Sequence, residues 1–147
     1  MRNFISLVLF ITICSGAFAQ KTPSAVLDAF AKKHPSSEVL EWEFFDGKYT
    51  SSFFEKDNYV VSIFDIKGNW LQSTTQITEE MLPPKVNKCW KKKYKNVQFV
   101  TAILKVVKYD SKPQYHISFE SSENLVNLVY NKRGRIKKKV EEPILLD

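Results

Sequence analysis

The first and second halves of this chain resemble each other position by position. Seven residues of the first half match residues 60 positions later, and six more match at a shift of 66. The first set pairs Pro23, Val26, Ala29, Phe30, Lys32, Lys33 and His34 with Pro83, Val86, Cys89, Trp90, Lys92, Lys93 and Tyr94. The second set pairs Tyr49, Phe53, Phe64, Asp65, Gly68 and Trp70 with Tyr115, Phe119, Tyr130, Asn131, Gly134 and Ile136. Similarity in this order predicts two repeats, at about residues 22–77 and 82–141.

Each half begins with a helical pattern and continues with strands. Val26, Ala29 and Phe30 follow the i, i+3, i+4 spacing of one apolar helix stripe, as do the matching residues of the second half. Asp46-Gly47 and Lys56-Asp57 predict two-residue hairpin turns, and Ile66-Lys67-Gly68 predicts a three-residue loop. The predicted fold class is therefore α+β, a tandem repeat of one helix plus a four-stranded antiparallel meander.

These turns fix a register in which one sheet face of each half is apolar. The predicted core positions are Trp42, Phe44, Tyr49, Phe53, Val60, Phe64 and Trp70 in the first half, and Tyr115, Ile117, Phe119, Val126, Leu128, Tyr130 and Ile136 in the second. We expect the helix of each half to cover this face, because an apolar sheet face must be buried. The polar residues predicted on it are Ser51, Ser62, Gln72 and Lys138.

The opposite face differs between the halves. In the second half it is mostly polar, with His116, Ser118, Glu120, Asn127, Lys137 and Lys139. In the first half it carries the candidate partner-binding residues, namely Phe45, Phe54, Tyr59, Val61, Ile63 and Leu71. An exposed apolar face of this size predicts an interaction surface. The alternative is that the tail Ile144-Leu145-Leu146 folds over it.

The first 19 residues have the pattern of a secretory signal peptide. Arg2 precedes an apolar run over residues 4–13, and small residues lead to a cleavage site after Ala19. A membrane anchor is the alternative, but a run of about ten apolar residues is half the length that a bilayer requires. The expected organisation is a signal peptide at 1–19 and one domain at 20–147, exported to the periplasm or secreted.

Cleavage would leave Cys89 as a single thiol, because Cys14 lies in the signal peptide. No disulfide within the chain is then possible, so the core alone must stabilise the domain. The alignment of Cys89 with Ala29 predicts a buried, inert thiol; the alternative is a half-exposed thiol at the margin of the helix.

The motifs of this chain also resemble a known family. They are Pro23, Phe30, His34-Pro35, Val39, Trp42, Asp46-Gly47-Lys48-Tyr49, Phe53, Phe64-Asp65, Gly68-Asn69-Trp70, Leu82-Pro83, Val86 and Tyr94. On these residues the mature chain resembles the PepSY-like family of exported Bacteroidetes proteins, which are described as β-lactamase-inhibitor-like. The resemblance implies a tandem fold like that of the β-lactamase inhibitor protein, whose curved sheet presents one face to a partner enzyme. No inhibitory residue carries over, because no local motif matches the contact residues of that inhibitor.

The sequence contains few candidate catalytic or metal-binding residues, and none of them forms a complete motif. His34 ends the first predicted helix, where a packing role is expected. His116 and Ser118 share a strand face, but no acid that would orient the histidine is recognisable, so we expect no enzyme. One Cys and two His at wide spacing match no zinc pattern, and we predict no metal or other cofactor.

A run of basic residues near the C-terminus supplies the basic surface candidates Arg133, Arg135, Lys137 and Lys139. An exported protein is not expected to bind nucleic acid. Lysines on a last strand protect a sheet edge from aggregation; the functional alternative is attraction to an anionic envelope surface or an acidic partner. With 21 Lys and Arg against 16 Asp and Glu, the net charge of the mature chain is +5.

The sequence thus predicts a non-enzymatic extracytoplasmic binding domain, an inhibitor or modulator of an envelope or secreted protein that binds through an exposed sheet face. The alternative is a carrier of a small metabolite or lipid in the cell envelope.

Overall fold

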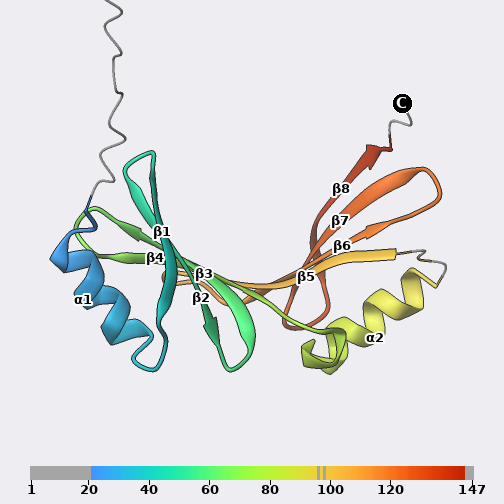
Figure 1. The fold of residues 1–147 in the computed structure, drawn as a ribbon. Helices are drawn as coiled ribbons and strands as arrows, with labels where there is room; N and C mark the ends of the chain where they lie inside the picture. The colour runs from blue at the N-terminus through green and yellow to red at the C-terminus, as the bar shows by residue number, and fades with distance from the viewer. Residues whose placement is uncertain (1–20, 96, 98, 145–147) are drawn as a thin grey trace, which may run out of the picture.

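The chain forms one antiparallel sheet with two helices, and the computed structural model describes residues 21–95, 97 and 99–144. Eight strands follow one another across the sheet in the order of the chain (Figure 1). Their bounds are β1 Val39–Phe45, β2 Lys48–Glu55, β3 Asn58–Asp65, β4 Trp70–Gln76, β5 Phe99–Lys108, β6 Gln114–Glu120, β7 Asn124–Asn131 and β8 Ile136–Pro143. Helix α1 spans Ser24–Lys33, the 3-10 helix η1 spans Glu79–Met81, and α2 spans Pro84–Lys93.

The predicted fold class, a tandem repeat of two helix-plus-meander units, is wrong. Strand β4 pairs with β5, from Gln72 with Lys108 to Gln76 with Leu104, so the eight strands form one sheet. Two separate meanders would leave four exposed edges, and an unpaired edge strand is a site of aggregation. Pairing β4 with β5 removes two of those edges.

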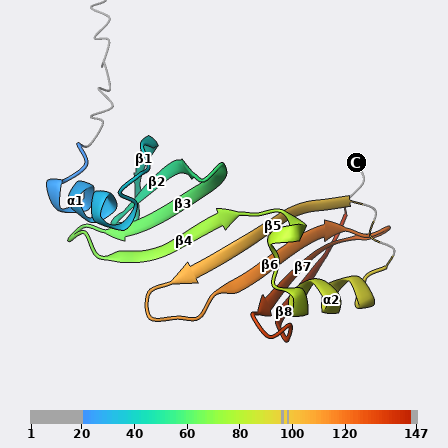
Figure 2. The same cartoon turned by 90° about the horizontal axis from the view of Figure 1, so that it is seen from below.

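Both helices lie on one face of the sheet (Figure 2), and each covers its own core. Under α1, Val26 and Phe30 pack with four buried side chains of β2 and β3. Under α2, Val86 and Trp90 pack with a larger cluster that extends to Ile77 and Leu82. The apolar stripes predicted for the helices are therefore confirmed at these positions. The predicted core face is confirmed as well, except that Phe44 at its margin is 42% exposed.

The predicted turns place the strands in the predicted register. Phe44 lies opposite Tyr49, Phe53 opposite Val60, and Phe64 opposite Trp70. The two central residues of both two-residue turns have positive φ, from +49° to +70°, as type I′ hairpin turns require.

Four strand pairs contain a register shift, and two of these shifts, which the sequence does not reveal, change the predicted face of three residues. One lies where β3 pairs with β4, so that Gln72 pairs with Ile63 on the face away from the helices. The other lies where β7 pairs with β8, and it places Lys138 on the outer face and Lys139 on the helix face. The predicted faces of Gln72, Lys138 and Lys139 are therefore wrong. Ser73 takes the core position that Gln72 was expected to hold.

Candidate functional site

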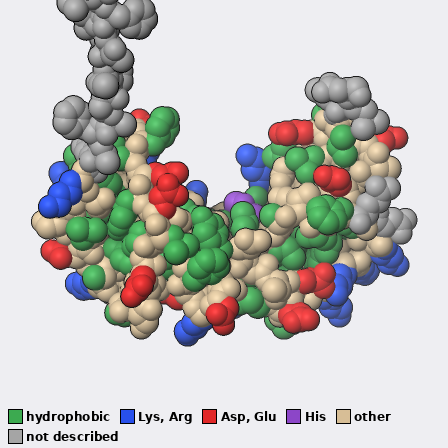
Figure 3. Space-filling view, in the orientation of Figure 1, with side chains coloured by type: hydrophobic (Ala, Val, Ile, Leu, Met, Phe, Trp, Pro, Cys, Tyr) green, Lys and Arg blue, Asp and Glu red, His purple; other side chains and the backbone are tan. Residues whose placement is uncertain are grey.

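The sheet face away from the helices, called the outer face here, borders a hollow between the two arms of the molecule (Figure 3). Four of the predicted partner-binding residues lie near one another on it. Tyr59, Val61 and Ile63 alternate along β3, and Phe54 of β2 lies directly opposite Tyr59. The Phe54 and Tyr59 rings pack edge to face with their centroids 5.7 Å apart, although the residues remain 56% and 39% exposed. These four residues form the β2–β3 apolar patch.

The other two predicted residues do not belong to this patch, and only Phe45 lies far from it. Phe45 is 85% exposed and pairs with Lys48 at the opposite end of β2, about 20 Å from Phe54 at the usual rise per strand residue. Leu71 occupies the bulge between Trp70 and Gln72, and its carbonyl accepts a hydrogen bond from the backbone of Tyr109. Four of the six candidates thus form the patch, Leu71 borders it beside Ile63, and Phe45 is an outlier.

Acidic side chains border the β2–β3 apolar patch. Glu41 and Glu43 of β1 line a recess of about 100 Å³ together with Thr50, Ser52, Tyr59 and Val61.

The described part of the C-terminal tail does not cover the patch. Ile144 donates its backbone N–H to the carbonyl of Glu123, beside the β7–β8 end of the sheet, and so does not lie on the patch. Leu145 and Leu146 of the predicted covering tail fall outside the described residues.

His116 and Ser118 lie on the outer face of β6, as predicted, but they do not form a catalytic pair. The Ser118 hydroxyl donates to Oδ1 of Asn127 at 2.6 Å. Burial, with a smaller contribution from the charge of Lys108, lowers the pKa of His116. Its Nε2 is buried and finds no hydrogen-bond partner among the described residues. A neutral imidazole without an acid to orient it is poorly placed to act as a base.

The structure also contains a carboxylate–histidine–hydroxyl chain that sequence reasoning missed. Nδ1 of His34 lies 3.1 Å from a Glu55 oxygen, and its Nε2 lies 3.0 Å from the Ser62 hydroxyl. This order of groups matches that of a hydrolase triad. Ser62 is, however, completely buried, and its Oγ also lies 2.5 Å from the Ser73 hydroxyl, so no substrate reaches it. These hydrogen bonds satisfy buried polar groups, and the expected packing role of His34 is confirmed.

The four basic candidates do not form one patch. Arg133 and Lys137 line a recess with Asp110 and Lys112. Lys139 pairs with Glu141, and that hydrogen bond is the main cause that raises the pKa of Lys139. Arg135 lies elsewhere, beside helix α2.

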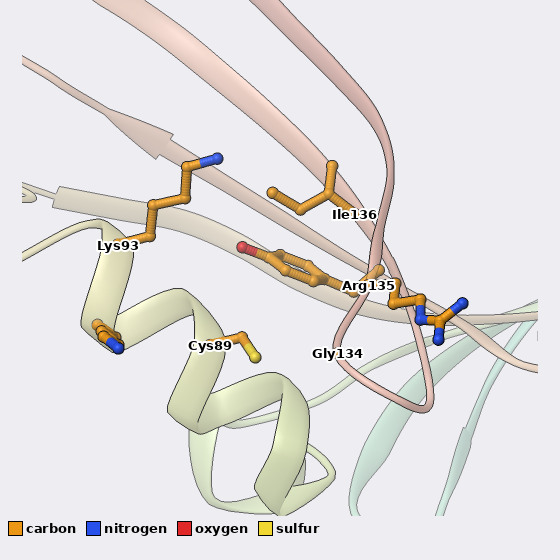
Figure 4. A pocket seen from close by; sticks show the side chains of 7 residues that line it. Cys89, Lys93, Gly134, Arg135 and Ile136 are labelled. Carbon is orange, nitrogen blue, oxygen red and sulfur yellow. The ribbon is translucent and has the colours of Figure 1, made fainter.

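A groove, called the α2 groove here, separates helix α2 from the hairpin that joins β7 and β8 (Figure 4). Its volume is about 580 Å³, and the residues that line it are Cys89, Lys92, Lys93, Tyr130, Gly134, Arg135 and Ile136. Cys89 is exposed here, so the prediction of a buried thiol is wrong. The apolar stripe of α2 buries Val86 and Trp90, but Cys89 lies at its margin and borders the open groove.

The described residues contain no group of three or more His, Cys, Asp or Glu that could hold a metal ion. Neither described helix has the length and apolar content needed to cross a bilayer.

Comparison with protein-family models finds no match, and neither does comparison with curated proteins. Several solved structures do match. A BLIP-like protein from Bacteroides fragilis, named after the β-lactamase inhibitor protein, has a TM-score of 0.76 and 20% identity, with 85% of this chain and 89% of that chain covered. A DUF2874 family protein from Bacteroides ovatus has a TM-score of 0.75 and 21% identity, with 81% and 86% covered.

A third match, from Bacteroides eggerthii, is named as a candidate periplasmic protein. It has a TM-score of 0.75 and 15% identity, with 82% of this chain and 88% of that chain covered. At identities this low the likeness shows the fold alone, which is BLIP-like.

Proposed function

We propose that this protein is a non-enzymatic extracytoplasmic binding domain that recognises a protein partner through the β2–β3 apolar patch. The observation that carries this proposal is the exposure of Phe54 and Tyr59, which pack on each other on the outer face beside the β2–β3 turn. Exposed aromatic residues supply many of the strongest contacts in protein interfaces. Glu41 and Glu43 border the patch, so the partner surface that fits it is apolar with a basic rim.

The BLIP-like fold and the neighbour named as periplasmic support an exported, inhibitor-like role. The proposal includes membership of the PepSY-like family and inhibition of an envelope enzyme. Attraction of the basic residues to an anionic envelope surface also stays a prediction.

The test is quantitative capture from envelope extract. The double variant Phe54→Ala/Tyr59→Ala should lose the partner, because it removes the two exposed rings. The matched control is Leu27→Ala, which truncates an apolar residue of α1 that is 42% exposed on the helix side. If the double variant recovers the same proteins as the wild type, the patch is not the binding site. If Leu27→Ala abolishes capture equally, the helix side binds instead.

The second candidate function, a small-ligand carrier, is favoured by one observation, the α2 groove. A metabolite or lipid that binds only the native state would raise the midpoint of thermal unfolding.

A further inference from the structure

The α2 groove contains a buried polar group that no residue satisfies. Tyr130 is 1% exposed and lines the groove, and its hydroxyl has no hydrogen-bond partner within the described part of the chain. An unpaired buried hydroxyl is costly, and most buried polar groups in proteins are paired. Burial also raises the pKa of Tyr130 to about 12, so this hydroxyl keeps its proton and can donate it in a hydrogen bond at neutral pH.

Charge in the groove has one sign. Lys92, Lys93 and Arg135 are among its lining residues, and none of these residues is acidic. In Figure 4, Lys93 from α2 and Arg135 from the hairpin lie on opposite sides of the opening. The rest of the lining is largely apolar, with Ile136, Cys89 and the Tyr130 ring. The groove therefore offers an apolar surface, one unpaired donor and positive charge.

The corresponding place under α1 is filled, which shows that this fold does not require an open groove. There Trp70 pairs with Phe64, as Ile136 pairs with Tyr130 in the other half. The Nζ of Lys33 lies 3.7 Å from the centroid of the Trp70 ring. Phe64 has no hydroxyl to satisfy. The open groove and its unpaired hydroxyl are thus specific to the half that contains α2.

We propose that the α2 groove binds a small amphiphile, an apolar chain that ends in a single oxyanion head group. The apolar chain lies against Ile136 and Cys89. The head group accepts a hydrogen bond from the Tyr130 hydroxyl and is neutralised by Lys93 or Arg135. A volume of about 580 Å³ falls within the range of about 300–1,000 Å³ that is usual for small-molecule sites. This inference deepens the carrier alternative and is independent of the β2–β3 apolar patch.

The test uses the chain without its predicted signal peptide, in which Cys89 is the single thiol. The probes are octanoate, octyl phosphate and the neutral analogue octanol, and binding is measured by calorimetry. A second readout is the rate at which a maleimide alkylates Cys89, which an occupant of the groove should slow. We expect octanoate or octyl phosphate to bind at least about tenfold more tightly than octanol, since charge-assisted hydrogen bonds are the strong ones. The tighter of the two assigns the head group as carboxylate or phosphate.

Two variants and one control locate the site. Tyr130→Phe should weaken octanoate binding about tenfold, and it should fold, because Phe64 holds the matching position under α1. Ile136→Trp should abolish binding by filling the groove as Trp70 does. Tyr109→Phe, at a tyrosine that is 72% exposed and lies outside both candidate sites, should change nothing. Equal affinity for octanol and the anions, no protection of Cys89, or unchanged binding by Tyr130→Phe would each overturn the proposal. If Ile136→Trp fails to fold, Tyr130→Phe decides.

Discussion

The two helix–sheet junctions of this molecule have similar backbones but different contents. Under α1, the indole of Trp70 occupies the space between helix and hairpin, and Lys33 lies over its ring. Under α2, the smaller side chain of Ile136 leaves the α2 groove open. The junctions also differ in polar satisfaction: His34 finds both Glu55 and Ser62, whereas the Tyr130 hydroxyl stays unpaired among the described residues. Natural proteins tend to break local packing rules where they have a function, which favours the second junction as a ligand site.

On the outer face, the candidate site lies in the first half of the molecule and not in the half that contains α2. The first half of this face carries the β2–β3 apolar patch, and its second half carries polar groups such as Ser118 and Asn127, which satisfy each other. The two candidate surfaces of the protein thus lie on opposite faces of the sheet and in opposite halves.

The largest expected effect concerns the hairpin glycines that touch the helices. A Cβ on Gly68 would lie 2.4 Å from the carbonyl oxygen of Ala25, and one on Gly134 would lie 2.7 Å from that of Lys85, each at positive φ. Gly68→Ala and Gly134→Ala should each lower the free energy of unfolding by about 3–4 kcal/mol, from left-handed strain and overpacking. Guanidinium denaturation measures this.

Gly47→Ala is the control for strain without a clash, because a Cβ there has no neighbour within 4 Å. It should cost only about 1 kcal/mol. If Gly134→Ala costs no more than Gly47→Ala, the hairpin under α2 is looser than that under α1, and the two junctions differ in backbone as well as in filling.

The next effect tests the filling itself. Trp70→Ile should lower the free energy of unfolding by about 2–3 kcal/mol, because it leaves a cavity and removes the contact with Lys33 and the hydrogen bond to Ser73. The reciprocal variant Ile136→Trp should change stability by at most about 1 kcal/mol, since the α2 groove has room for the indole. Thermal unfolding of both variants makes the comparison. Equal large losses would mean that the α2 groove is packed as tightly as the junction under α1.

Local sequence patterns predicted the helix stripes, the hairpin turns and the core faces. These features depend on residues that are close in sequence. Asp46-Gly47, for example, forms a turn whose conformation is compatible with the two strands that it joins. The pairing of β4 with β5 was missed because nothing local distinguishes an edge strand that remains open from one that pairs across a long connection. The bulges at Leu71 and Lys137 were missed because the residues that follow each bulge are mostly polar, so the sequence does not show that the alternation of faces has shifted by one residue.

The candidate sites were predictable only in part. The positions of Phe54 and Tyr59 on the outer face were predicted from the strand register, which the turns define. The exposure of Cys89 did not follow, because Cys89 borders a groove that it shares with Ile136, a residue 47 positions away in sequence. The link of His34 to Glu55 and Ser62 likewise joins three elements. The sequence did predict that His34 ends a helix that covers the sheet face carrying Ser62, but only the packing of α1 on the sheet brings the two side chains together.

Alkaline pH should separate the two junctions. Burial raises the pKa of Tyr130 from about 10 to about 12, so the folded state holds this proton more tightly than the unfolded state does. The corresponding stability is fully present below pH 10 and is lost as pH rises to 12, a change of at most about 2.7 kcal/mol, which screening by solvent reduces. Phe64, at the matching position under α1, contributes nothing of this kind.

Urea denaturation between pH 8 and 11.5 tests this, with Tyr130→Phe as the comparison. The variant should lose less stability at high pH than the wild type. A smaller dependence should persist, because burial also raises the pKa of Tyr115. Identical alkaline slopes for wild type and variant would show that Tyr130 ionises as freely in the folded protein as in the unfolded chain.

The smallest effect on stability, and the most direct comparison of the junctions, involves thiol reactivity. Cys89 is exposed beside the α2 groove, so a maleimide should label the native protein promptly, and Cys89→Ala should change the free energy of unfolding by less than about 0.5 kcal/mol. Ala29 is the counterpart of Cys89 on α1, and it is partly buried against the core that contains Trp70. In a Cys89→Ala background, an Ala29→Cys thiol should therefore react on the order of tenfold more slowly than Cys89 in the native protein, because the filled junction restricts access to the sulfur. Both thiols should react alike once the protein is unfolded in guanidinium, which controls for intrinsic reactivity. If the two native rates are equal, Trp70 does not shield its side of the helix, and the contrast between a filled and an open junction fails.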